Sequence, residues 1–208
     1  MTEHLTINFI KMNSMKTRIA FISLLSAAAL SSSAQIYTGK SHDISFFSDG
    51  PIEDIYAVTK SAQFILSATK NEVAIKITVK GFDFDKELME EHFNEKYMET
   101  DKKGPKDAKG NDTYPNRYAT FSGKINETVD YKKDGVYKVT VTGKLYIHGV
   151  EKERTISGTI TVKGSEVYIE SKFTVALKDH KIEIPTLVAQ NIAETVDVTI
   201  KSTLILAK

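Results

Sequence analysis

Alternating hydrophobic and polar residues dominate the chain from Val73 onward. In "VAIKITVK" (73–80) every second residue is aliphatic, and lysine or threonine takes most of the other positions. This period of two predicts a β-strand with one buried face and one exposed face. The pattern recurs at 137–147, 156–162, 167–177 and 196–204. We therefore expect a protein built mainly from half-buried β-strands.

Short polar turns separate these strands. "TKNE" (69–72), "KKDG" (132–135) and "VKGSE" (162–166) are long enough for hairpins but too short for helical crossovers, so the strands should be antiparallel. Many strands with this spacing form a sandwich or a closed barrel, and the length of the chain favours an all-β barrel of about eight strands. Gly143 and Gly158 interrupt the apolar face of two strands, where a missing side chain permits a sharp bend. The alternative is that these glycines merely weaken the strands.

One segment has helical periodicity instead. In "DFDKELMEEHFNEKYM" (83–98), Met89, Phe93 and Tyr97 recur every four residues among acidic and basic positions. This spacing predicts a short amphipathic helix, for which Asp85 is a candidate N-terminal cap.

Two further segments depart from the β pattern. The stretch 184–195 has Pro185 where the first turn of a helix accepts it, which predicts a second helix from a weaker pattern. The stretch 101–114 is polar and rich in glycine and lysine, and we expect it to be an exposed loop.

The composition indicates one globular domain. The chain has 208 residues, of which 41% are hydrophobic and 26% charged. The 28 basic residues nearly balance the 27 acidic ones, and no zinc-finger spacing or RNP-like run is present, so we do not expect nucleic-acid binding. The chain has no cysteine, which excludes both disulfides and a lipid anchor on cysteine.

The N-terminal segment has the layout of a secretory signal peptide. Lys16 and Arg18 precede an apolar run (19–30), and Ser32-Ser33-Ala34 provides small residues for cleavage. We therefore interpret 1–34 as an upstream extension and signal peptide, with Met15 as the start, and 35–208 as one exported domain, periplasmic or secreted. A retained membrane anchor is the alternative, but the apolar run is shorter than the roughly 18 residues that cross a bilayer.

Sequence motifs for catalysis or metal binding are missing. The chain contains no G-x-S-x-G, Walker or G-x-G-x-x-G motif, and the glutamates around His92 lack H-E-x-x-H spacing. We expect no metal, no cofactor and no enzymatic activity. The interpretation of His42, His92, His148 and His180 is that they are polar residues at the surface or at strand ends. An enzyme that uses His92 or His148 is the alternative.

Three separated segments resemble one known family. "LMEEHFNEKYMETDK", "YPNRYATFSGKI" and "YKVTVTGKLYIHGVEKERTISGTITV" resemble, in this order, segments of the YceI-like family of exported lipid-binding proteins. The likeness covers about residues 44–201 and implies a lipocalin-like barrel whose tunnel holds a polyisoprenoid or a related long-chain lipid. It also implies that His148 lies at a strand corner. Residues 102–113 look like an insertion relative to the family.

The inward face of such a barrel is apolar, so a ligand inside it should be oily and long. An alternative is a barrel packed solid by these side chains, which would suit a stress protein or a protein-interaction module. Tyr168 and Ile205 leave apolar groups on the outer face, which leaves a homodimer open. The candidate ligand-binding residues are Phe64, Ile75, Ile77, Phe82, Phe84, Phe93, Tyr97, Phe121, Val139, Val141, Ile147, Phe173 and Val175.

Overall fold

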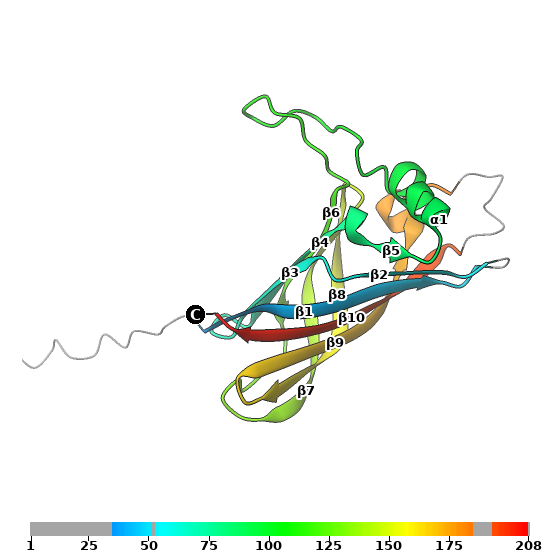
Figure 1. Cartoon of the computed structure of the whole chain (residues 1–208). Coiled ribbons are helices and arrows are strands. Elements are labelled where there is room, and N and C mark those ends of the chain that lie inside the picture. The colour runs from blue at the N-terminus through cyan, green and yellow to red at the C-terminus, as the bar shows by residue number, and fades with distance from the viewer. Residues whose placement is uncertain (1–34, 51–52, 185–192, 208) are drawn as a thin grey trace, which may run out of the picture. The chain divides into compact units, whose positions relative to one another are not determined.

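The structure is a computed structural model that describes residues 35–50, 53–184 and 193–207. These residues form a closed antiparallel barrel of eight strands with one 11-residue helix, which confirms the predicted fold class (Figure 1). The strands are β1 (Ile36–Ser48), β2 (Ile55–Thr59), β3 (Ala62–Ser67), β4 (Glu72–Thr78), β5 (Asp83–Phe84), β6 (Tyr118–Ile125), β7 (Gly135–Ile147), β8 (Val150–Lys163), β9 (Glu166–Ala176) and β10 (Thr195–Leu206).

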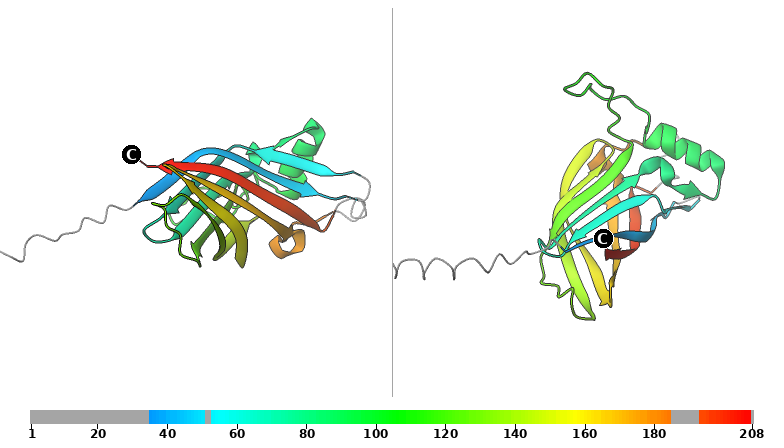
Figure 2. Two further views of the ribbon diagram at one scale, coloured as in Figure 1. Left: turned by 90° about the horizontal axis from the view of Figure 1, so that it is seen from below. Right: turned by 60° about the vertical axis from the view of Figure 1, so that its left-hand side comes forward.

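Strand β1 closes the barrel. Going round the wall, the order is β10, β9, β8, β7, β6, β4, β3 and β1, and β1 pairs in turn with β10. On its other edge β1 pairs with β3 near its start and with β2 near its end. Strand β2 also carries the short β5, so the wall extends past β3 toward the helix (Figure 2).

The alternation in the sequence corresponds to the strands that it predicted. Strands β4, β7, β8, β9 and β10 cover the five alternating segments, and each buries the apolar side of its pattern. Gly143 of β7 lies opposite Gly123 of β6. A Cβ atom on Gly143 would come within 2.2 Å of the Ser122 carbonyl oxygen, so the close approach of these two strands requires glycine there.

The predicted helix covers one end of the barrel, opposite the C-terminal end of β10 (Figure 1). It consists of α1 (Glu87–His92) and a wider π-helical turn, η2 (Phe93–Tyr97). The expected cap at Asp85 is wrong. The residue that precedes the helix is Lys86, and its side chain makes no capping hydrogen bond, because the short β5 holds 83–84 in the sheet and delays the helix start.

Three single-turn or coil segments complete the described chain. The turns η1 (Val79–Gly81) and η3 (Leu177–His180) follow β4 and β9. The stretch 102–112 is almost entirely exposed, which confirms the expected loop. Residues 1–34, with the predicted signal peptide, and 185–192, with most of the second predicted helix, lie outside the described residues. Within the described part, no helix has the length and hydrophobicity needed to span a membrane.

Candidate functional site

Three apolar cavities follow one another through the interior of the barrel toward the helix. We call them the inner, middle and outer cavities, with volumes of about 70, 140 and 280 Å³. The inner and middle cavities share Ile75, Phe121, Phe173 and Ile200. Because neighbouring cavities have side chains in common, they make a continuous row, which we call the cavity row.

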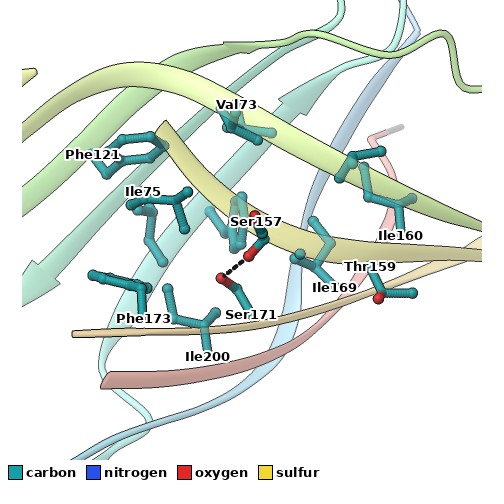
Figure 3. A pocket seen from close by; sticks show the side chains of 15 residues that line it. Val73, Ile75, Phe121, Ser157, Thr159, Ile160, Ile169, Ser171, Phe173 and Ile200 are labelled. Carbon is teal, nitrogen blue, oxygen red and sulfur yellow. Dashed lines mark hydrogen bonds between the residues drawn. The ribbon is translucent and has the colours of Figure 1, made fainter. Parts of the chain in front are cut away.

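The inner cavity lies within the barrel, and its wall comes from β3, β4 and β6 to β10 (Figure 3). Aliphatic and aromatic side chains make almost all of it. The polar exceptions are Ser157, Thr159 and Ser171, where β8 and β9 meet. The Ser171 hydroxyl donates a hydrogen bond of 2.7 Å to the Ser157 carbonyl oxygen and is thereby satisfied.

The middle and outer cavities lead from the barrel to the helix. The middle cavity is wholly apolar, whereas Ser48, Glu53 and His92 bring polar groups to the outer one. The residues that line both are Phe46, Phe93, Met98, Leu177, Ile182 and Val196.

All thirteen candidate ligand-binding residues line at least one of the three cavities. Phe64, Val139 and Val141 line the inner cavity only, and Phe84 and Tyr97 line the outer cavity only. The other eight line the middle cavity, some of them together with a neighbouring one. The structure thus brings the thirteen together around one space, and their contact with a ligand stays a prediction.

Four phenylalanine rings form a cluster where the helix meets the barrel. Phe93 of the helix lies 5.4 Å from Phe46 of β1, 6.0 Å from Phe82 and 5.1 Å from Phe84, between ring centroids. Phe46 is also 5.2 Å from Phe82, edge to face. Since Phe46 and Phe93 line both the middle and the outer cavity, this cluster forms the partition between them.

Sequence reasoning missed several residues of the row. Phe46, Leu177, Ile182, Val196 and Ile200 line it but were not among the candidates. For Val196 and Ile200 the signal was present, because both belong to the apolar face of an alternating segment. Phe46 stands beside a second phenylalanine, and adjacent apolar residues on opposite faces of a strand hide which one points inward.

Polar side chains lie inside the barrel at the end away from the helix. The Tyr37 and Tyr131 rings are 5.9 Å apart, and burial raises the pKa of Tyr131. The His42 ring stacks on Phe64 at 6.4 Å and shares a hydrogen bond of 3.1 Å with the Ser202 hydroxyl. Burial lowers the pKa of His42, so the interior favours its neutral form.

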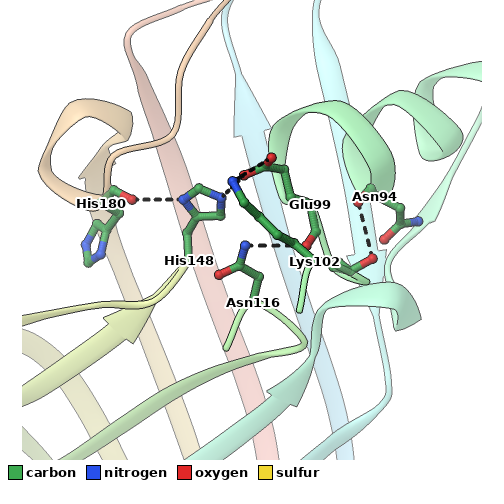
Figure 4. Close-up of polar contacts among 7 residues, drawn as sticks. Asn94, Glu99, Lys102, Asn116, His148 and His180 are labelled. Atoms are coloured by element: carbon green, nitrogen blue, oxygen red, sulfur yellow. Dashed lines mark hydrogen bonds and ion pairs between the residues drawn. The ribbon is translucent and has the colours of Figure 1, made fainter. Parts of the chain in front are cut away.

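The histidines at the other end are less exposed than the sequence suggested. His148 occupies the β7–β8 turn, with a backbone φ of 51°, as its predicted corner position requires. Its side chain, however, is only 10% exposed and lies between two neighbours (Figure 4). Nδ1 is 3.2 Å from the His180 carbonyl oxygen, and Nε2 is 3.4 Å from a Glu99 carboxylate oxygen. The ring therefore connects the chain after the helix to turn η3.

Of the two positions expected for His180, the surface is wrong and the strand end is right, because the residue lies in turn η3 directly after β9. The side chain is fully buried, and Nδ1 donates a hydrogen bond of 3.2 Å to the Val150 carbonyl oxygen. Burial lowers the pKa of His180 more than its hydrogen bonds raise it. Turn η3 folds back against β8, and this fold buries a residue that polar neighbours on both sides made look exposed. In the described chain, no three histidine, aspartate or glutamate side chains are grouped as a metal site.

Comparison with known proteins identifies the family. The model of the YceI-like domain matches residues 52–204. The structure is similar to a polyisoprenoid-binding domain from Saccharophagus degradans that is implicated in plant cell wall breakdown. The TM-score is 0.65 at 14% identity, over 84% of this chain and 99% of that one.

A second similar structure is BcnA from Burkholderia cenocepacia, with a TM-score of 0.60 at 18% identity, over 78% of this chain and 95% of that one. At these identities the two likenesses show the fold. No curated protein sequence matches the chain significantly. Because the family model covers most of the sequence and the barrel agrees with it, the protein belongs to the YceI-like family.

Proposed function

We propose that this protein is an exported, non-catalytic binding protein that holds a long-chain apolar or amphiphilic lipid, of the polyisoprenoid class, in the cavity row. The observation that carries the proposal is the row itself: three apolar cavities with shared walls, arranged end to end. A row of this kind suits a long and narrow guest better than a compact one. The polyisoprenoid-binding domain with the same fold supports the choice of lipid.

Burial of the lipid's hydrocarbon chain supplies enough free energy for binding without any charged contact. Each methylene removed from water contributes about 0.8 kcal/mol, so ten of them contribute roughly 8 kcal/mol before the cost of ordering the ligand. The middle cavity offers no polar surface that would oppose this transfer. Affinity should therefore grow with chain length until the row is full.

The alternative function is a stress protein or protein-interaction module with a solid barrel. The cavity volumes of about 140 and 280 Å³ argue against solid packing, because voids larger than a water molecule are few in ordinary protein interiors.

Organic extraction and mass spectrometry of the protein purified from its native compartment test the proposal. We expect repeated recovery of a long-chain lipid, and repeated recovery of none would favour the alternative. N-terminal sequencing of the same material tests export, because removal of the predicted signal peptide should leave Gln35 as the first residue.

A blocked variant gives a second test. Ile200 lines both the inner and the middle cavity, so Ile200→Phe should fill the space between them and reduce the amount of bound lipid. The matched control is Thr199→Phe, one position along β10, which the alternation places on the opposite face. If both variants keep the full complement of lipid, the row is not the binding site.

A further inference from the structure

The barrel wall is split between β8 and β9. Ladder pairing of these strands runs from Lys163 and Glu166 to Gly158 and Ser171, and within the described residues it ends there. Beyond this point β8 continues for eight residues to Val150, paired only with β7, and β9 continues to Ala176, paired only with β10. Over about half the length of β8, the edges of β8 and β9 therefore face each other without ladder hydrogen bonds between them.

Side chains satisfy part of the exposed backbone at this split. Besides the bond from the Ser171 hydroxyl to the Ser157 carbonyl, His180 donates to the Val150 carbonyl. In the middle, an Arg154 guanidinium nitrogen donates a hydrogen bond of 2.9 Å to the Thr174 carbonyl oxygen of β9. Unpaired backbone carbonyls near an apolar interior need such partners, so the three bonds hold the split edges in place.

Arg154 is a cation at this split, and among the residues that the structure describes no carboxylate pairs with its guanidinium. The ion pairs of the described residues do not include it. The nearby Asp197 is already held by Lys172 at 3.3 Å and by the Thr174 hydroxyl at 2.9 Å. A guanidinium has five N–H donors, and one neutral carbonyl uses only part of them. Arg154 can therefore accept an anion without losing an existing ion pair.

The position of Arg154 relates it to the cavity row. It shares the inward face of β8 with Ile156, which lines the inner cavity. The carbonyl that it contacts lies between Phe173 and Val175, and both of these side chains line the middle cavity. A half-buried cation, unpaired within the described part of the chain, thus stands beside the apolar row, at the place where the wall lacks ladder bonds.

We infer that Arg154 binds the anionic head group of an amphiphile whose chain occupies the cavity row, with the head at the β8–β9 split. The chemistry is that of a phosphate or carboxylate on a long hydrocarbon chain, because a guanidinium binds both with two parallel hydrogen bonds. The inference rests on the proposed function and adds to it the charge of the head group and the side of the barrel where it lies.

Competitive binding to the delipidated full-length mature protein tests the inference. The readout is displacement of the neutral fluorescent probe N-phenyl-1-naphthylamine, and the chain has no tryptophan to interfere. The competitors are geranylgeraniol, geranylgeranyl phosphate and a fatty acid of similar length. We expect the wild type to bind at least one of the two anions about tenfold more tightly than the alcohol, and the tighter anion identifies the head group.

Variants assign the preference to Arg154. Arg154→Gln should abolish the preference for the anion and leave the affinity for the alcohol unchanged, whereas Arg154→Lys keeps the charge but not the two parallel hydrogen bonds and should retain only part of the preference. Arg117→Gln is the matched control, because it removes the same charge from a residue that pairs with Asp101. Added salt should weaken anion binding to the wild type and spare the alcohol, which tests the charge without any variant.

The outcomes separate the two proposals. Equal affinity of the wild type for alcohol and anions, or a preference that survives in Arg154→Gln, would overturn the inference and leave the proposed function standing. Failure of all three compounds to displace the probe would contradict the proposed function and the inference together.

Discussion

Removal of the Phe93 side chain should both destabilise the protein and open the row of cavities. Phe93 is the helix residue of the phenylalanine cluster, with three other rings between 5.1 and 6.0 Å away. Truncation of a fully buried phenylalanine to alanine costs about 3–5 kcal/mol. Because Phe93 is only partly buried, we expect Phe93→Ala to lower the free energy of unfolding by about 2 kcal/mol.

Two measurements follow from this value. In a domain of this size, about 2 kcal/mol corresponds to a fall in Tm of roughly 6 °C, which thermal unfolding monitored by circular dichroism detects. The same change removes the partition between the middle and outer cavities, so a bound apolar probe should dissociate faster. Stopped-flow dilution of the probe complex measures that rate.

A second variant on the same helix is the control. Leu88 is 61% exposed, so Leu88→Ala should change the free energy of unfolding by less than about 0.5 kcal/mol and leave the dissociation rate as it is. If Phe93→Ala behaves like Leu88→Ala in both assays, the helix does not close the row through Phe93, and the reasoning fails.

Three further predictions concern the wall and the interior. Gly143→Ala should cost about 3 kcal/mol or prevent folding, because its Cβ would meet the Ser122 carbonyl, whereas Gly135→Ala meets only a side chain and should cost little; urea denaturation compares them. Burial lowers the pKa of His180 below its ordinary value of 6.5, so the unfolded chain binds the proton first and stability should fall as the pH drops below about 6.5. His180→Asn should make that part of the stability–pH profile less steep, and the remaining slope should come from His42, whose pKa burial also lowers. Burial raises the pKa of Tyr131, so this tyrosine should ionise only at the most alkaline pH, together with unfolding. In a spectrophotometric titration, Tyr131→Phe should therefore remove one ionising tyrosine from the most alkaline part of the curve and leave the rest unchanged.

The strands that sequence patterns predicted are those with uninterrupted alternation. Strand β1 was not predicted, because its register shifts between Gly39 and Ser41. This shift moves the inward-facing side chains from odd to even positions along the strand. Polar residues also occupy inward positions of β1. The His42 ring fills the space where Gly39 lacks a side chain, and Ser48 is buried at the strand end. A search for alternating apolar residues passes over such a strand.

The cavity lining was predictable because alternation reports which face of a strand is apolar. The alternation does not show whether a strand is hydrogen-bonded to the next strand along its full length. The apolar alternation runs past the last ladder pair in both strands, to Ile156 in β8 and through Phe173 and Val175 in β9, so it gives no sign that the ladder between them stops at Gly158 and Ser171. The split, and the place of Arg154 within it, therefore became visible only in three dimensions. The burial of His180 has the same origin, because it depends on the contact of a turn with a distant strand.

The loop between Lys102 and Asp112 offers a place to attach reporters. Its tip is a turn in which the Asp107 carboxylate accepts hydrogen bonds from the Lys109 and Asn111 backbone, and a pair between Lys103 and Asp112 joins its two arms. None of these residues lines the cavity row. Because the chain contains no cysteine, Lys109→Cys would give a single thiol for a dye or a surface tether outside the lining of the cavity row. The protein could thus be immobilised in one orientation for real-time sensing of hydrophobic molecules.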